Sequence, residues 1–103
     1  MFWNIELKSI ELENGTALGL SVGNPQKPEK AMIIILVGKK GLIVCRNFDI
    51  KALDERGVAA ARVQGISSFE EALKANIESF TTKAKELGIN LGMTGREALA
   101  KFL

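Results

Sequence analysis

"AMIIILV", from Ala31 to Val37, is the longest apolar run in the chain. A strand that is buried on one face alternates between apolar and polar residues, and this stretch contains no polar residue. The run therefore predicts a central strand that is covered on both faces. The residues that follow, Gly38 to Gly41, predict a tight turn into a second strand, "LIVC", from Leu42 to Cys45.

The segment before this run predicts a β-hairpin whose first strand is irregular. Apolar residues alternate with polar ones near the N-terminus at Trp3, Ile5 and Leu7. Two later apolar residues have the other parity, Ile10 and Leu12. We expect a bulge near Lys8 and Ser9, because a bulge would return both groups to one face. Asn14-Gly15 predicts the turn, since both residues tolerate positive φ.

Residues 23–30, "GNPQKPEK", separate the returning strand, Leu18 to Val22, from the central one. Pro25 and Pro28 have no backbone N–H group to donate to a sheet ladder. This segment is also rich in residues that are typical of turns. A loop is therefore expected between the two strands.

After the second hairpin the sequence predicts a short helix and a fifth strand. Asp49 is placed to cap a helix that continues to Glu55 or Arg56. Gly57 then supplies the left-handed residue that commonly ends a helix. The segment from Val58 to Val63 is short and bounded by Gly57 and Gly65, and it predicts the strand.

One long helix is predicted after the fifth strand. Ser67 and Ser68 each precede a glutamate by three residues, which is the spacing of a capping box. Apolar residues then recur every three or four positions: Phe69, Ala72, Leu73, Ile77, Phe80, Ala84 and Leu87. Gly88 ends this predicted helix, and Thr94 begins another near the end of the chain.

Together these elements predict an α+β fold. Its sheet has about five mostly antiparallel strands, formed by two N-terminal hairpins and a helical crossover to the fifth strand. The helices are expected to pack on one face of the sheet. Residues 1–103 have the length of a single domain, and we expect one.

Composition argues against several classes of protein. Fourteen basic and twelve acidic residues leave a net charge of +2, so neither a nucleic-acid nor a membrane partner is expected. The chain has no histidine and one cysteine, so neither a metal site nor a cofactor is expected. It has no signal-peptide pattern and no apolar run near the roughly 20 residues that span a bilayer. We expect a cytoplasmic protein.

The start of the last helix is the strongest candidate for a binding site. Thr94 and Glu97 have capping-box spacing, so Gly95 and Arg96 open the helix with free backbone N–H groups. An arginine in a first turn is unfavourable unless a negative group lies near it. The candidate site for a small anionic ligand therefore consists of Gly92, Thr94, Gly95 and Arg96. The alternative is a plain helix cap, in which the arginine meets a carboxylate of the protein.

Two other arginines and the cysteine are further candidates. Arg62 lies among alanines on the fifth strand, and Arg46 follows Cys45 at the end of another strand. Either arginine could supply a second cation for the anion. For Arg62 we favour a structural role, with an ion pair to one of three acidic residues: Asp49, Asp54 or Glu55. Cys45 is a weak candidate nucleophile without a histidine base, and a small buried side chain is the favoured interpretation.

The two ends of the chain predict self-association into a dimer or a larger homo-oligomer. The last helix is too short to be stable alone, so it must pack on its own sheet or on a neighbouring chain. Its apolar side includes Phe102 and Leu103. Phe2 and Trp3 are further candidates for an interface, where tryptophan is enriched.

Three blocks between Gly41 and Leu99 are distinctive when taken together: "IVC", "RGVAAARVQGISSFEEAL" and "KELGINLGMTGREAL". With them the sequence resembles the YunC-like family, bacterial and archaeal proteins with a domain of unknown function. The resemblance implies a compact α+β fold and no established activity, so it assigns no catalytic residue. Arg46 stands where the family pattern implies a small residue such as glycine, which narrows the space beside Cys45.

These observations lead to three hypotheses of function. The first is a small self-associating domain of unknown role that binds an anionic metabolite at Gly92–Arg96. The second is a structural or adaptor subunit that binds another protein through an apolar face. The third is an enzyme that depends on Cys45, and we favour a protein that is not an enzyme.

Overall fold

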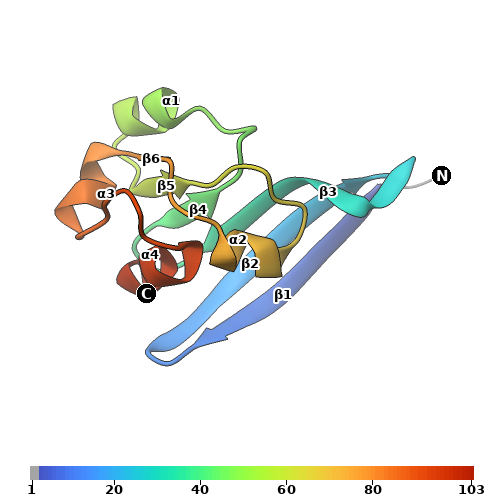
Figure 1. Ribbon diagram of the computed structural model, residues 1–103, viewed down its shortest axis with the longest axis horizontal. Coiled ribbons are helices and arrows are strands. Elements are labelled where there is room, and N and C mark those ends of the chain that lie inside the picture. Colours follow the sequence, from blue (N-terminus) through green and yellow to red (C-terminus); the bar gives the residue numbers. More distant parts are fainter. Residues whose placement is uncertain (1–2) are drawn as a thin grey trace.

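The computed structural model describes residues 3–103, apart from the side chains of Pro28 and Glu29. Within these residues a mixed sheet has six strands in the order β1-β2-β3-β4-β5-β6 (Figure 1). The strands are β1 (Asn4–Leu12), β2 (Gly15–Asn24), β3 (Lys27–Val37), β4 (Leu42–Val44), β5 (Ala60–Arg62) and β6 (Ser79–Phe80). The helices are α1 (Ile50–Glu55), α2 (Phe69–Lys74), α3 (Thr82–Glu86) and α4 (Gly95–Lys101). The predicted α+β fold is confirmed, with a short sixth strand in addition.

The N-terminal hairpin forms as predicted, but the bulge expected near Lys8 and Ser9 is wrong. β1 pairs with β2 in one continuous register over the whole of its length. Because side chains alternate along a regular strand, Ile5 and Leu7 point to one face of the sheet and Ile10 points to the other. The change of parity in the sequence therefore marks a change in which face of β1 is apolar.

Most of the loop predicted at residues 23–30 belongs to strands instead. Only Pro25 and Gln26 form the turn between β2 and β3. The pairing of these two strands shifts register just before the turn. Pro28 lies in this irregular part of β3, where the ladder does not need a donor from every residue.

The second hairpin and the crossover to the fifth strand are confirmed. β3 pairs antiparallel with β4 across the turn at Gly38 to Gly41, and β4 pairs parallel with β5. α1 lies on the crossover between β4 and β5. The side chain of Asp49 accepts hydrogen bonds from the backbone N–H groups of Lys51 and Ala52, as expected of an N-cap residue.

The long helix predicted between Ser68 and Gly88 is wrong. α2 and α3 form its two ends, and the short strand β6 lies between them. The backbone becomes extended at Ala75, and the segment then pairs antiparallel with β5. Residues 76–82, "NIESFTT", are asparagine, serine, aromatic and β-branched in the main, and such residues are poor helix formers. Thr81 caps the new helix α3.

α2 and α4 lie on one side of the sheet and close the core there (Figure 1). Phe102, which follows α4, is fully buried, and its carbonyl accepts a hydrogen bond from the backbone of Lys40 in the β3–β4 turn. A Cβ atom at Gly41 would lie 2.6 Å from Cδ1 of Phe102, so a glycine is needed for the ring to approach this turn. The last helix therefore packs on its own sheet. Among the helices of residues 3–103, none has both the length and the apolar character to cross a membrane.

Candidate functional site

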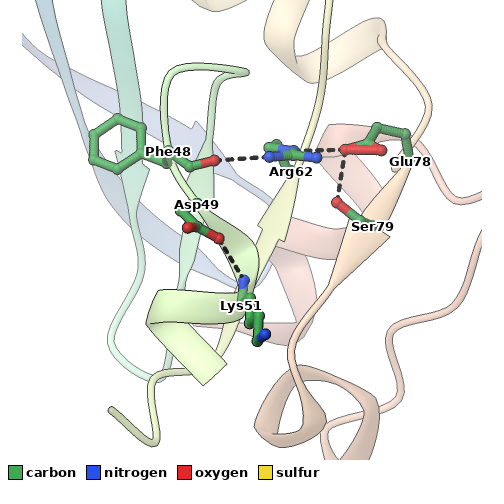
Figure 2. Close-up of polar contacts among 6 residues, drawn as sticks. All are labelled: Phe48, Asp49, Lys51, Arg62, Glu78 and Ser79. Carbon is green, nitrogen blue, oxygen red and sulfur yellow. Dashed lines mark hydrogen bonds and ion pairs between the residues drawn. The ribbon is translucent and has the colours of Figure 1, made fainter. Parts of the chain in front are cut away.

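Arg62, at the end of β5, joins two segments that are far apart in the sequence (Figure 2). Its Nε donates to Oε1 of Glu78 over 2.5 Å, and its Nη1 donates to the backbone carbonyl of Phe48 over 2.8 Å. The hydroxyl of Ser79 donates to the same oxygen of Glu78. The hydrogen bond from Arg62, followed by that from Ser79, holds the pKa of Glu78 below its ordinary value. Arg62 therefore fixes the loop before α1 against the segment that forms β6.

The acidic partner of Arg62 differs from the three that were expected. Asp49 caps α1, and Asp54 accepts hydrogen bonds from the backbone N–H and the hydroxyl of Thr82. The prediction is wrong because residues 79–80 pair with β5 as a strand, which brings Glu78 beside Arg62. With its side chain 23% exposed, Arg62 is a partly buried structural link.

The start of α4 forms the predicted cap. The Thr94 hydroxyl accepts a hydrogen bond from the backbone of Glu97, and the Glu97 carboxylate accepts one from the backbone of Thr94. The backbone N–H of Gly95 donates to the carbonyl of Ala75 over 2.8 Å. A Cβ atom at Gly95 would overlap with the carbonyl oxygen of Ala72. Gly95 is therefore required by the contact between α4 and α2.

The three arginines of the predicted anion site do not come together. Gly92 has a φ of 92° and open space around its α-carbon. Arg96 lines a hollow of about 320 Å³ beside the β1–β2 turn, whereas Arg46 lines a different hollow at the end of β4. Arg62 lines neither of these hollows. Anion binding at Gly92–Arg96 stays a prediction, which rests on the start of α4 alone.

Cys45 lies directly after β4 and is 4% exposed. Its Sγ accepts a hydrogen bond from the backbone N–H of Ile34 over 3.4 Å, and its side chain belongs to the hydrophobic core. Arg46 and Asn47 follow it along the hollow at the end of β4, whose volume is about 290 Å³. In the described part of the chain, no cysteine and acidic side chains gather into a group that could hold a metal ion.

The residues predicted for an interface at the chain ends fall into two groups. Phe102 is fully buried and Leu103 is partly buried, both against the core of the same chain. Trp3 is 54% exposed directly before β1. Phe2 lies outside the described residues. Exposed apolar side chains therefore remain at the N-terminal strand and not at the last helix.

The sequence analysis missed an apolar surface that spans four strands. It lies on the side of β1–β4 opposite α2 and α4, and we call it the open face. Its positions alternate with core positions along each strand: Ile5, Leu7, Ser9, Leu18, Leu20, Val22, Ile33, Ile35, Val37 and Leu42. Among its apolar side chains, Leu7, Ile5 and Leu18 are the most exposed, at 65%, 64% and 45%. Ser9 is the one polar residue among these ten, and none of them is charged. Toward the β1–β2 turn the same side of the sheet continues with Glu11 and Thr16, and the Thr16 hydroxyl donates to the Glu11 carboxylate over 2.8 Å.

β1 shows that the open face is apolar by pattern and not by chance. Glu6 and Lys8 point to the helix side of the sheet, where Lys8 forms an ion pair with Glu70 over 3.4 Å. Ile5 and Leu7 point the other way. A strand whose only core lay under the helices would have the reverse arrangement. The first half of β1 is therefore patterned for a core on the open face.

The central strand β3 is covered on one face, and the prediction that it is covered on both is wrong. Ile34 and Leu36 are 2% and 0% exposed in the core under the helices. Ile33, Ile35 and Val37 alternate with them on the open face and are only partly buried. Toward β5, where α1 lies, the same side of the sheet becomes buried again. The change of parity in β1 is the sequence signal that identifies the open face.

The fold defines a class: α+β proteins in which short helices pack on a mixed sheet. Residues 44–102 match the family described as "Domain of unknown function (DUF1805)". The chain is also 33% identical over 103 residues to "Uncharacterized protein YunC" of Bacillus subtilis (strain 168), which covers 96% of this chain and 98% of that protein. This chain therefore belongs to the DUF1805, YunC-like family, as the sequence resemblance implies.

A solved structure has the same fold. It is a protein of unknown function, TA1206 from Thermoplasma acidophilum, and it matches with a TM-score of 0.87. The match covers 100% of this chain and 97% of that chain at 20% sequence identity. At this identity the likeness concerns the fold alone.

Proposed function

We propose that this protein works by association with protein through the open face, as a self-associating or structural subunit. The observation that carries the proposal is the exposure of Ile5, Leu7 and Leu18 on a contiguous apolar surface, whose charged neighbour Glu11 lies at its end by the β1–β2 turn. Contiguous apolar patches on soluble proteins mark binding surfaces when they reach a few hundred Å². The open face spans four strands and has the pattern of an unpaired core layer.

The free energy available from covering the open face supports this role. Burial of apolar surface contributes about 25 cal/mol per Å², or about 1.5–3 kcal/mol for a leucine or isoleucine that passes from exposed to buried. Ile5 and Leu7 are each about two-thirds exposed, so these two side chains alone offer on the order of 3 kcal/mol. Seven partly buried or exposed apolar neighbours add to this value.

Site-specific cross-linking tests the proposal. A photoreactive phenylalanine analogue replaces Leu7 in one variant and Glu6 in a control, because the two neighbours point to opposite faces of β1. On illumination of growing cells, the analogue at position 7 should form a covalent adduct with protein, and the analogue at position 6 should form far less. Peptide mapping of the adduct then identifies the partner. Absence of an adduct at position 7, or equal adducts at both positions, would contradict the proposal.

A further inference from the structure

We infer that the protein that covers the open face is a second copy of this chain, packed face to face around a two-fold axis. This inference rests on the proposed function and adds the identity of the partner. In the resulting dimer the two sheets form a sandwich, with α2 and α4 of each copy on the outside. The β1, β2 and β3 strands of both copies supply most of the contact.

The size of the open face matches a partner that is itself a sheet. β1, β2 and β3 have 9, 10 and 11 residues. With a rise of about 3.3 Å per residue and a strand spacing of about 4.8 Å, the outer side of these three strands measures roughly 30 Å by 15 Å. The open face forms the apolar middle of this side, at positions 5–9, 18–22 and 33–37. Two such surfaces bury on the order of 1,000 Å² in total, which reaches the lower limit of specific interfaces. A metabolite or a single extended peptide would leave most of this surface exposed.

The chemistry of the open face favours self-pairing over a partner of another kind. A surface that selects a different protein uses charges or hydrogen-bonding groups to discriminate. The ten positions of the open face include no charge, and Ser9 at its border is their one polar side chain. On the same side of β1 and β2, Glu11 and Thr16 lie beyond them at the end by the turn, where the Thr16 hydroxyl donates to the Glu11 carboxylate. Two copies can therefore meet over an apolar centre, with Glu11 and Thr16 at the polar rim of the contact.

The shape of the layers also fits two identical sheets. Sheets with the same twist pack face to face about 10 Å apart, with their strands rotated by about 30°. A two-fold axis in the contact plane brings the same patch of both copies together, and two-fold dimers are the most frequent homo-oligomers. Each sheet then has a core on both faces, which is what the uninterrupted apolar sequence of β3 specifies.

Sedimentation velocity of the purified chain, compared with three variants, tests the inference. Wild-type protein at about 50 μM should sediment as a dimer of the 11.2 kDa chain. Leu7→Lys places a charge in the contact and should raise the dissociation constant at least thirtyfold. Glu6→Lys introduces the same side chain on the opposite face of the same strand, and it should change the dissociation constant less than threefold.

A third variant separates face packing from pairing of the outer edges of β1, which is the other symmetric way to join two copies. Leu20→Lys lies on β2, inside the sheet, so it affects the open face without touching that edge. It should weaken the dimer as strongly as Leu7→Lys, while circular dichroism shows that each variant is folded.

The outcomes are distinct. A wild-type dimer that Leu7→Lys and Leu20→Lys dissociate supports the inference. A dimer that survives both variants forms elsewhere, which overturns the inference and the association of copies through the open face. A wild-type monomer overturns the inference but leaves the proposed function standing if the cross-linker at position 7 captures a different protein. A wild-type monomer without that adduct overturns both.

Discussion

The two faces of the first three strands are both apolar, yet their surroundings are opposite. On the covered face, Ile10, Ile34 and Leu36 are at most 6% exposed under α2 and α4. On the open face, Ile5 and Leu7 are 64% and 65% exposed. The helices α2 and α4 have six and seven residues, and they cover only one side of these strands. Apolar patterning therefore shows which strand positions are suited to burial. The lengths of the helices decide whether the same chain buries them.

The largest effect should come from removing the aromatic ring that closes the covered face. Phe102→Ala should lower the free energy of unfolding by about 4 kcal/mol, because a fully buried side chain is lost and a cavity remains. The control Leu7→Ala removes an apolar side chain of the open face and should change the stability of the monomer by less than about 0.5 kcal/mol. Urea unfolding at low protein concentration measures both values. Equal losses would contradict the contrast between the two faces.

A smaller loss is expected where α4 touches α2 above the covered face. Gly95→Ala should lower the free energy of unfolding by about 3 kcal/mol, because the new Cβ would overlap with the carbonyl oxygen of Ala72 and force the helices apart. Gly92→Ala is the matched control. Open space surrounds Gly92, and only its positive φ opposes alanine, at about 1 kcal/mol. Thermal or urea unfolding of both variants checks the order, and a milder effect at Gly95 would show that the contact can relax.

Local chemistry accounts for the elements that could be predicted from the sequence. Asn14-Gly15 specifies the first turn, while Asp49 and Thr94 cap the helices that follow them. Each of these residues acts on backbone groups within a few positions of itself. Residues 76–82 fail as a prediction for the opposite reason. Their apolar spacing suits a helix, but most of them are weak helix formers, and Ser79 and Phe80 pair with the separate strand β5.

The same distinction applies to the candidate sites. The capping role of Thr94 is local and is confirmed, whereas the need for Gly95 arises from Ala72 on another helix. Arg62 meets Glu78 only because β6 forms. The change of parity between Leu7 and Ile10 predicts the open face if it is interpreted as a change in which side of β1 is apolar. Sequence spacing alone cannot distinguish that interpretation from a bulge, because both restore the alternation.

The pair of Arg62 and Glu78 at the edge of the sheet should contribute a pH-dependent stability of about 1 kcal/mol or less, since both side chains are partly exposed. The folded pKa of Glu78 lies below its ordinary value of 4.5, because Arg62 and then Ser79 donate to its carboxylate. The stabilisation is therefore present above pH 4.5 and is lost as the pH falls through the folded pKa. Urea unfolding should show a difference between wild type and Glu78→Gln at pH 7 that shrinks at pH 3. A difference for Glu78→Gln that is equal at both pH values would contradict this role.

The smallest effect should come from completing the open face at its one polar position. Ser9 lies opposite Leu18 in the β1–β2 ladder and is exposed, so Ser9→Leu should change the stability of the monomer by less than about 0.5 kcal/mol. In the dimer the new side chain adds apolar area to the contact, and the dissociation constant should fall about three- to tenfold, or by about 1 kcal/mol. Glu6→Leu adds the same side chain on the helix side of the same strand and should leave the dissociation constant unchanged. Sedimentation equilibrium over a dilution series measures both variants. If Ser9→Leu behaves like Glu6→Leu, or loosens the dimer, Ser9 lies outside the contact and the packing of the two sheets is offset toward Ile5.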